Sequence, residues 1–309
     1  MKASDSSSIR ISAATIKAAA TTVGFHACGI AKACHLPDFQ AELNGWLSQG
    51  SEADMQYMGR HSDMRCDPAI LLPGAKSVVS VLLGYKPTHT MSGNNKIAQY
   101  AYGEDYHEKV KRMLFLMIAE IQKTHPDFEA KPCVDTVPIS DKHWAARAGL
   151  GWIGKNTLLI NRELGSLCFV GELVTTAEVA EYDQPTEPLC GDCTRCVEAC
   201  PNHAIRFLPE AGTYVVNSAL CLSYQTIENR ANALPADLKR NDYVYGCDCC
   251  QNACPYNHDS EPRLSISEDR IAALESLPQV DEPTFKRFVK HSAMNRIKYY
   301  QWQRNLKKY

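Results

Sequence analysis

The sequence lacks the long apolar runs and leader segments that are typical of membrane and exported proteins. No stretch of its 309 residues approaches the roughly 20 consecutive apolar residues that a transmembrane helix needs. Residues 12–30 are small and apolar, but Lys17 interrupts them, and Arg10 stands alone rather than in a twin-arginine pair. We therefore expect a cytoplasmic protein that does not associate with a membrane.

Two common nucleotide-binding motifs are also missing. The chain contains neither the G-x-x-x-x-G-K-[ST] motif of a P-loop nor the G-x-G-x-x-G motif of a dinucleotide-binding fold. The Gly-rich run "GLGWIGKN" at 149–156 matches neither of them. Residue spacing alone therefore names no cofactor for the N-terminal part of the chain.

Apolar runs alternate with amphipathic patterns through the first 180 residues, which predicts an α/β (α+β) domain with a sheet and covering helices. The clearest strand is the Val- and Leu-rich run 75–85. The clearest helix is 105–125, where apolar residues recur at three- and four-residue steps. Further helices are expected at 9–23, 39–58 (with a break near Gly50) and 140–150, and further strands at 25–33, 128–139 and, around a Gly turn, within 157–179.

A Pro-rich polar stretch at 181–188 marks the end of this first domain, which we place at 1–180. Residues 181–265 hold most of the cysteines and are expected to form a second, ferredoxin-like domain. The pattern over 266–309 is helical, with Leu274 and Leu277 on one face. We therefore expect two domains followed by a helical, basic C-terminal segment.

The cysteine content indicates metal binding. A cytosolic chain would not hold its fourteen cysteines as disulfides, because that compartment keeps thiols reduced. Nine of them lie between Cys190 and Cys254. The run from Cys190 to Pro201 has the spacing C-x2-C-x2-C-x3-C-P of bacterial [4Fe–4S] ferredoxins, in which the fourth cysteine binds the other of two clusters. Structural zinc sites favour paired C-x2-4-C arms, so zinc is the less favoured alternative.

A partial copy of this motif, "CDCCQNACP" from Cys247 to Pro255, lacks a leading cysteine, and Cys221 is the candidate for that position. The spacing then predicts a first cluster on Cys190, Cys193, Cys196 and Cys254, and a second cluster on Cys200, Cys221, Cys247 and Cys250. Cys249 is left over, since using it in place of Cys250 gives a poorer fit to the motif.

The C-terminal segment has an uneven charge. Residues 283–309 hold eight Lys or Arg and no Asp or Glu, although the whole chain has a net charge of −2. Aromatic residues are interleaved with these cations: Phe285, Phe288, Tyr299, Tyr300, Trp302 and Tyr309. Two interpretations stay open, a solvated helix whose aromatic residues dock on the body of the protein, or a surface that contacts nucleic-acid phosphates.

Four motifs together resemble the epoxyqueuosine reductase family: "CVDTVPISDKHWAARAGLGWIGKNTLLI", "GDCTRCVEACPNHAI", "CLSYQTIE" and "YGCDCCQNACPYN". The resemblance extends from about residue 20 to the end of the chain. It implies a cobalamin- and iron–sulfur-dependent oxidoreductase of queuosine biosynthesis and tRNA processing. An external donor of flavodoxin or ferredoxin type would supply electrons through two [4Fe–4S] clusters to a base-off cobalamin. The enzyme would then reduce epoxyqueuosine at the wobble position of tRNA to queuosine.

The resemblance also implies roles for individual residues. The proton donor of the family falls on Asp135, and donation at neutral pH would require that burial beside the corrin raise the pKa of Asp135. The expected cobalamin contacts are Arg60, Ala98, Asp135, Lys142, Tyr224, Cys247 and Asp248. For Arg60 and Lys142 a role as plain surface cations is equally compatible. His107 lies in half of a D-x-H-x-x-G cobalt-ligand pattern whose Gly is missing, so we expect it to serve a helix start instead.

Many members of this family continue into helical repeats that help to hold tRNA, whereas this chain ends at "RNLKKY". The basic segment would then carry more of the RNA contact, and we expect a monomer. Two rival functions use similar modules. A reductive dehalogenase shares the cofactors but usually has a twin-arginine signal, and a non-catalytic electron carrier would take up no cobalamin.

Overall fold

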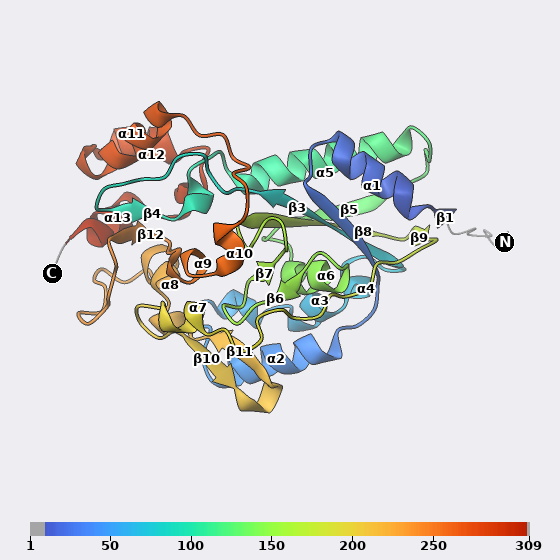
Figure 1. Cartoon of the computed structure of the whole chain (residues 1–309), viewed down its shortest axis with the longest axis horizontal. Coiled ribbons are helices and arrows are strands. Elements are labelled where there is room, and N and C mark those ends of the chain that lie inside the picture. Colours follow the sequence, from blue (N-terminus) through green and yellow to red (C-terminus); the bar gives the residue numbers. More distant parts are fainter. Residues whose placement is uncertain (1–9, 308–309) are drawn as a thin grey trace.

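A computed structural model describes residues 10–307, and a four-stranded antiparallel sheet lies in its N-terminal part (Figure 1). The strand order is β2 (Ala27–Lys32), β3 (Ser77–Gly84), β8 (Cys168–Thr175) and β5 (Ala130–Cys133). All eight residues of β3 are buried, which confirms the prediction of a buried strand within 75–85. The mixture of sheet and helices agrees with the predicted fold class.

Two helices, α1 (Ala13–Thr22) and α5 (Tyr106–Gln122), cover one face of this sheet (Figure 1). The side chains that α5 buries recur at the predicted three- and four-residue steps: Val110, Met113, Leu114, Met117 and Ile121. They pack in one apolar cluster with Val79, Val81 and Leu173 of the sheet. The Asp105 carboxylate caps α5 by accepting a hydrogen bond from the His107 backbone at 3.0 Å, which places His107 in the first turn.

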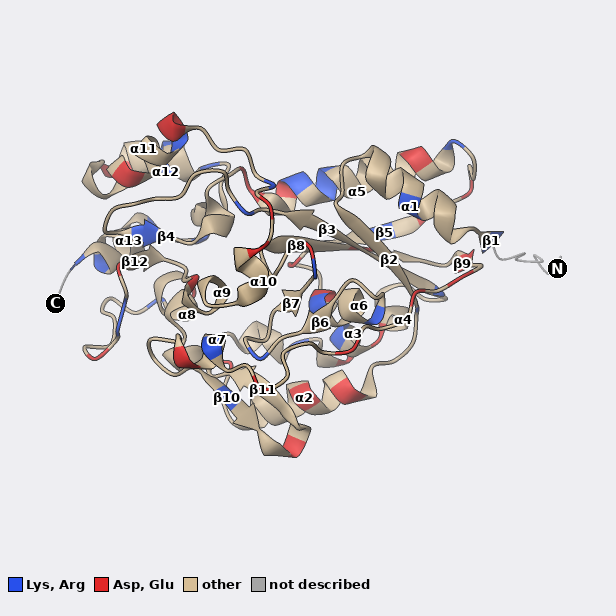
Figure 2. Cartoon of the chain, viewed as in Figure 1, with Lys and Arg blue, Asp and Glu red and all other residues tan. Residues whose placement is uncertain are grey.

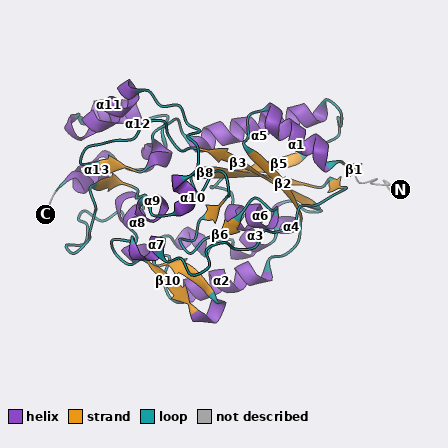
Figure 3. Cartoon of the chain, viewed as in Figure 1, coloured by secondary structure: helices purple, strands orange, loops and turns teal. Residues whose placement is uncertain are grey.

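The opposite face carries α6 (Asp141–Arg147), with the short helices α3 (Ser62–Cys66) and α4 (Pro68–Leu71) near it (Figure 3). Trp144 of α6 is fully buried and packs with Val78 and Val174 of the sheet. Ser140 is the residue before α6, but its hydroxyl pairs with His143 Nδ1 at 2.6 Å and makes no bond to the helix backbone. The predicted helix at 140–150 is confirmed. Its first residue, Asp141, lies on the side of α6 that faces the sheet.

Two other segments differ from the prediction in detail. The helix expected at 39–58 is α2 (Pro37–Ser48), and after the break at Gly50 only a short 3-10 turn, η1 (Gln56–Met58), follows. Strands do form on both sides of Gly165, but β7 (Leu159–Ile160) pairs with β6 (Trp152–Ile153) and not with β8. β6 was missed because a two-residue strand leaves no alternation to detect.

The cysteine-rich part consists of short elements, and a strand links it to the N-terminal part. β12 (Tyr243–Tyr245) pairs in parallel with β4 (Lys96–Ile97), and β1 (Arg10–Ile11) pairs with β9 (Glu178–Val179). The other elements of residues 189–260 are α7 (Arg195–Glu198), β10 (Ile205–Leu208), η3 (Pro209–Ala211), β11 (Thr213–Val216), η4 (Ser218–Leu220), α8 (Leu222–Ile227), α9 (Cys249–Asn252) and α10 (Pro255–His258).

The C-terminal segment is helical, as predicted, and it is packed against the rest of the protein. Its elements are α11 (Glu268–Ser276), η5 (Leu277–Gln279), α12 (Glu282–Val289), η6 (Ala293–Arg296) and α13 (Tyr299–Leu306); η2 (Gln99–Ala101) lies in the loop that they contact. Phe285 and Trp302 are buried with Ile97 and Tyr245 in one apolar cluster. That cluster draws on all three predicted domain ranges, whose limits stay a prediction. Within residues 10–307 no helix is both long and apolar enough to cross a bilayer.

Most of the aromatic residues of this segment dock on the body of the protein, which favours the first of the two interpretations given above. Arg304 is only 2% exposed, and its guanidinium donates hydrogen bonds to the carbonyl oxygens of Asn229 and Ala231 at 2.9 and 2.7 Å. Tyr300 stays 46% exposed. Tyr309, the last aromatic residue of the predicted set, lies outside the described residues. The cations at 286, 287, 290 and 298 are exposed, and of these Lys286 forms an ion pair with Glu282 at 2.7 Å.

Candidate active site and cluster-binding cysteines

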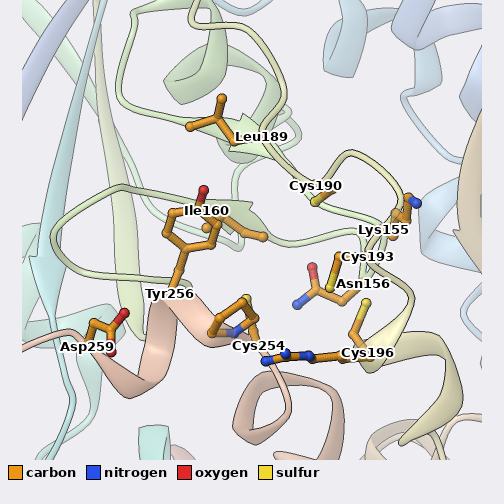
Figure 4. Close-up of a pocket in the computed structure, with 12 residues that line it drawn as sticks. Lys155, Asn156, Ile160, Leu189, Cys190, Cys193, Cys196, Cys254, Tyr256 and Asp259 are labelled. Atoms are coloured by element: carbon orange, nitrogen blue, oxygen red, sulfur yellow. The ribbon is translucent and has the colours of Figure 1, made fainter.

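The four cysteines predicted for the first cluster line one cavity of about 350 Å³ (Figure 4). Cys190 and Cys193 come from the loop that leads into α7, Cys196 lies in α7, and Cys254 precedes α10. The fourth cysteine therefore comes from the partial motif and not from the run that contains the first three. The structure brings together the set that the ferredoxin spacing predicts.

Hydrogen-bond donors surround this cavity. The Trp152 indole N–H donates to Cys190 Sγ at 3.4 Å. Asn156 is 3% exposed, and within residues 10–307 its side-chain nitrogen has no hydrogen-bond partner, although the residue lines the cavity (Figure 4). Such donors stabilise thiolate and sulfide sulfur, so the cavity fits an anionic iron–sulfur group.

The second predicted set is also gathered in one region. Burial raises the pKa of the Cys250 thiol, and the nearby thiols of Cys221 and Cys200 raise that pKa further. Cys247 hydrogen-bonds to the spare Cys249, whose sulfur also accepts a bond from Asn241 Nδ2 at 3.7 Å. Cys250, rather than Cys249, is thus the residue that lies with Cys200 and Cys221.

Single-ion binding fits these cysteines less well. In the part of the chain that the structure describes, no group of three or more His, Cys, Asp or Glu side chains is placed to hold one metal ion. A zinc ion needs its sulfur ligands at about 2.3 Å, which brings them close together. Four cysteines spread around a cavity suit a larger, polynuclear group.

A second candidate site forms around Asp135, which follows β5. The Tyr106 hydroxyl and His107 Nε2 both lie 2.8 Å from Asp135 Oδ2. The other ring nitrogen of His107 lies 2.7 Å from Asp105 Oδ1. The Asp135 side chain is nonetheless 58% exposed, and its backbone has φ of 45°, a left-handed conformation that costs free energy for a residue other than Gly. The first turn of α5 thus holds an accessible carboxyl in a strained loop.

The pKa of Asp135 differs from the prediction. Partial burial alone would raise the pKa of Asp135, but hydrogen bonds from His107 and Tyr106 outweigh it, and the pKa lies below its ordinary value. Burial lowers the pKa of His107, while its bonds to Asp135 and Asp105 raise that pKa to a net value above the ordinary one. The expected rise for Asp135 is therefore not met by these residues alone, because the prediction considered burial and not the imidazole beside it.

The sequence did not identify three of the residues near Asp135. Arg296 of η6 donates from Nε and Nη2 to the Glu228 carboxylate at 2.9 and 2.8 Å, and its charge lowers the pKa of Asp135. Burial and the charge of Glu228 raise the pKa of Tyr57, on which Arg296 and Asp135 also act. The basic composition of the C-terminal segment was a signal for Arg296, but nothing in the sequence indicated its partner.

Three of the expected cobalamin contacts lie together. The Ala98 backbone N–H donates to the Tyr245 carbonyl at 2.8 Å. The next residue, Gln99, donates its backbone N–H to Asp248 Oδ2 at 2.9 Å. These bonds hold the Ala98 segment against Cys247 and Asp248, so the structure joins two segments that the resemblance named separately.

The remaining expected contacts are placed as follows. The Tyr224 hydroxyl donates to Asp54 Oδ2 at 2.8 Å, which ties α8 to the turn before η1. Lys142 Nζ donates to the Thr157 carbonyl at 2.9 Å, and burial lowers the pKa of Lys142. Lys142 is therefore not a plain surface cation. Arg60 is exposed, as the alternative for that residue expects.

Comparison with known proteins decides the family. The family model described as Epoxyqueuosine reductase QueG, DUF1730, matches residues 65–136, and the 4Fe-4S double cluster binding domain matches residues 189–257. A curated protein of Cellulophaga algicola named epoxyqueuosine reductase is 39% identical over 299 residues, which cover 94% of this chain and 95% of that protein. This chain belongs to the epoxyqueuosine reductase family. Membership makes it an oxidoreductase, confirms the two predicted [4Fe–4S] clusters, and disfavours the dehalogenase and electron-carrier alternatives.

Solved epoxyqueuosine reductases share the whole fold. The Streptococcus thermophilus enzyme matches with a TM-score of 0.83 and 30% identity, over 94% of this chain and 78% of that one. A family structure with an epoxyqueuosine-modified tRNA-Tyr stem loop matches with a TM-score of 0.79 and 27% identity, over 95% and 79%. A Bacillus subtilis structure, in which an aspartate-bearing catalytic loop is swung out of the active site, matches with a TM-score of 0.78 and 27% identity, over 95% and 79%.

Proposed function

We propose that this protein reduces epoxyqueuosine to queuosine at the wobble position of tRNA, the last step of queuosine biosynthesis. The observation that carries the proposal is the joint presence, in one chain of this family, of the predicted cluster cysteines and the accessible Asp135 carboxyl. Removing the epoxide oxygen as water and leaving an alkene consumes two electrons and two protons. The clusters held by the cysteines would supply the electrons, the Asp135 site would supply one proton, and water would supply the other.

Each cluster would be held by its predicted set of cysteines. Cys190, Cys193, Cys196 and Cys254 would bind the first cluster, and Cys200, Cys221, Cys247 and Cys250 would bind the second. When bound, the clusters supply one-electron transfer. The backbone bonds between the Ala98 segment and Asp248 bring the second set next to the expected cobalamin contacts, whereas Cys193 of the first set is exposed. An external donor of flavodoxin or ferredoxin type would therefore dock at the first set.

The residues of the N-terminal part fit a cobalamin. The corrin carries many amide groups on its rim, and buried polar atoms without a partner are suited to bind them. Within the described residues, Glu52 Oε2 and Arg65 Nε are buried and have no hydrogen-bond partner. Both flank the turn of Tyr57 to Arg60, and the Tyr224 hydroxyl reaches Asp54 in the same stretch. Together with Ala98, Lys142, Cys247 and Asp248, these residues would hold cobalamin, whose cobalt supplies the reducing electrons to the epoxide.

Asp135 would deliver the proton. Oδ2 of Asp135 faces two donors, and of these His107 has a pKa that its bonds to Asp135 and Asp105 raise above the ordinary value, which favours the protonated imidazole. His107 Nε2 can replace the proton that Asp135 gives to the departing oxygen. Covering the site with cofactor and substrate would remove water from the carboxylate, and this desolvation raises the pKa of Asp135 toward a value suited to donation. The aspartate-bearing catalytic loop of the Bacillus subtilis relative supports this assignment.

A turnover assay tests the proposed function. The purified chain is reconstituted with iron, sulfide and cobalamin, reduced chemically, and given an epoxyqueuosine-modified tRNA stem loop. We expect queuosine to form, as measured by mass spectrometry of the nucleosides. A matched reaction with a brominated phenol should give no bromide. Uptake of both cofactors without any conversion of epoxyqueuosine would exclude the proposal.

We expect the exposed cations at the end of α12 to contact the tRNA. The His291 carbonyl accepts a hydrogen bond from the Asp105 backbone at 2.8 Å, so the end of α12 lies next to the start of α5 and its His107. Arg287 and Lys290 are exposed there (Figure 2 shows the charged residues of the chain). The double variant R287Q/K290Q should bind the stem loop several-fold more weakly at low salt. The slope of log affinity against log salt should fall by about 1 to 2, because each phosphate contact releases counterions.

Two other exposed lysines provide the control for this experiment. Lys123 follows the last residue of α5, at the far end from His107, and Lys131 lies in β5; K123Q/K131Q removes the same charge. This control should leave the salt slope unchanged. Equal effects of the two double variants would show that only net charge matters. Deleting the whole segment is not informative, because Phe285 and Trp302 belong to the core.

We also propose that the protein acts as a monomer in the cytoplasm.

A further inference from the structure

A buried pair of carboxyl groups lies behind the Asp135 loop and has no part in the chemistry described above. Glu172 is 0% exposed, in the middle of β8, and is in register with Ser80 on β3 and Cys133 on β5. Its side chain points to the α6 side of the sheet, because Val78 and Val174, two positions away on the paired strands, pack on Trp144. Asp141, the first residue of α6, faces Glu172 from that side.

The two carboxyl groups have hydrogen-bond partners only if they hold a proton. Among the described residues, both oxygens of Glu172 and Oδ1 of Asp141 are buried without any donor. The carboxyl groups are within hydrogen-bonding distance of each other, but two carboxylates are acceptors only and repel. Burial raises the pKa of Glu172 well above its ordinary value and raises the pKa of Asp141 to about 7. One shared proton turns two unpaired anions into an O–H···O bond.

This pair is connected to Asp135 through the main chain. The backbone N–H of Asp135 faces the Asp141 carboxyl, near enough to favour its ionised form and so to lower the pKa of Asp141. Asp135 is the residue with φ of 45°, and an isolated loop would not keep that conformation without support. The bonds from Tyr106 and His107 hold its side chain, whereas the contact of its N–H with the Asp141 carboxyl orients its backbone. Glu172 in turn fixes the Asp141 carboxyl.

We propose that Asp141 and Glu172 share one proton and act as a positioning pair, which holds the Asp135 backbone in the orientation that presents its carboxyl to the substrate. The inference rests on the proposed role of Asp135 but concerns residues that touch neither substrate nor cofactor. Four titratable groups face the pair, and they come from three surrounding segments: Cys133 and Asp135 from β5 and the loop after it, Arg65 from α3, and Tyr106 from α5. Loss of the shared proton would leave two adjacent carboxylates that repel each other, and a displaced Asp141 would no longer hold the loop.

Two substitutions of Glu172 separate positioning from packing. In E172Q the amide donates to Asp141 without needing a proton, so the loop should stay in place. In E172L the donor is lost, and hydrogen exchange of the peptide around residues 134–137 should be about tenfold faster than in the wild type. Turnover should fall by about tenfold with little change in KM, because the carboxyl is misplaced rather than removed. S80A, which removes a buried polar atom next to Glu172, is the matched control and should change neither quantity.

Stability against pH supplies a readout that does not depend on turnover. The pKa of Asp141 is raised from 3.8 to about 7, so the folded protein binds more protons than the unfolded chain in this window. The free energy of unfolding should therefore decrease as pH rises from about 4 to 7. With no shared proton to lose, E172Q should show a flatter decrease. The infrared C=O band of protonated carboxyl groups should be present in the wild type at pH 7 and weaker in E172Q, where only the component from Asp248, whose pKa burial raises to about 7, remains.

These measurements distinguish failure of this inference from failure of the proposed function. Unchanged exchange at 134–137 in folded E172L would overturn the positioning role, whatever the substrate. If E172L does not fold, an E172Q variant with the wild-type infrared band and the wild-type dependence of stability on pH would overturn the shared proton. A wild-type enzyme that fails to convert epoxyqueuosine refutes the function alone, because the exchange and infrared experiments need no substrate.

Discussion

The D135N variant should lose turnover of epoxyqueuosine by about two to four orders of magnitude, the range expected when a general acid is removed. The substitution keeps the size of the side chain, and its oxygen can still accept the bond from the Tyr106 hydroxyl. Folding, both clusters and cobalamin uptake should therefore be preserved. The measurement is single-turnover formation of queuosine with chemically reduced enzyme, so that electron delivery from an outside donor does not limit the rate. Full activity in this variant would exclude Asp135 as the proton donor.

A matched control for D135N is D127N, because Asp127 is an exposed acid in the loop before β5 and its loss should have no effect. The variant H107Q tests where the proton comes from. The raised pKa of His107 means that its positive charge persists below that value and is lost as pH rises through it. Wild-type turnover should therefore decline on the alkaline side. H107Q should be slower and lack that decline, and an unchanged alkaline limb in H107Q would exclude His107 as the source of the proton.

The cluster-binding region could be predicted from the sequence because metal ligation is encoded in short spacings. The motif names three cysteines directly, and the exchange of the fourth residue between two clusters is a rule that holds at any separation along the chain. The cavity that contains Cys190 and Cys254 agrees with that rule. The amphipathic helix α5 and the buried strand β3 were predictable for a similar reason, since one periodicity covers each whole element.

The carboxylate site could be predicted only in part, since its residues meet only in the folded chain. Asp135 came from the family resemblance, and His107 was expected to serve the start of α5, where it does lie in the first turn. Its second contact, to Asp135, joins α5 to the loop after β5 and leaves no local pattern. Glu172 did leave a signal, because a Glu between Val170 and Val174 on one face of an apolar strand predicts a buried charge. The sequence does not show which residue pairs with Glu172, and only the fold places Asp141 opposite it.

The largest effect outside the Asp135 site is expected for Cys254. It is 7% exposed, precedes α10, and lines the cavity of the first three motif cysteines, although it lies in the second motif. C254A should therefore lose about half of the iron and sulfide, and electron transfer to the epoxide should stop. The electron paramagnetic resonance signal that remains should match that of C193A, because both variants keep only the second cluster.

If each cluster takes its fourth cysteine from the other motif, single cysteine variants should resemble one another in a way that ligation within each motif would not produce. C200A should resemble C221A, although Cys200 belongs to the first motif, whereas C249A should keep both clusters and near-normal turnover as the matched control. Cys249 lies beside Cys247 and is therefore the cysteine best placed to reveal an error in the second set. If C254A instead resembled C221A, each motif would hold its own cluster and the exchange rule would not apply to this chain. Loss of one cluster in C249A would place Cys249 in the second set in place of Cys250.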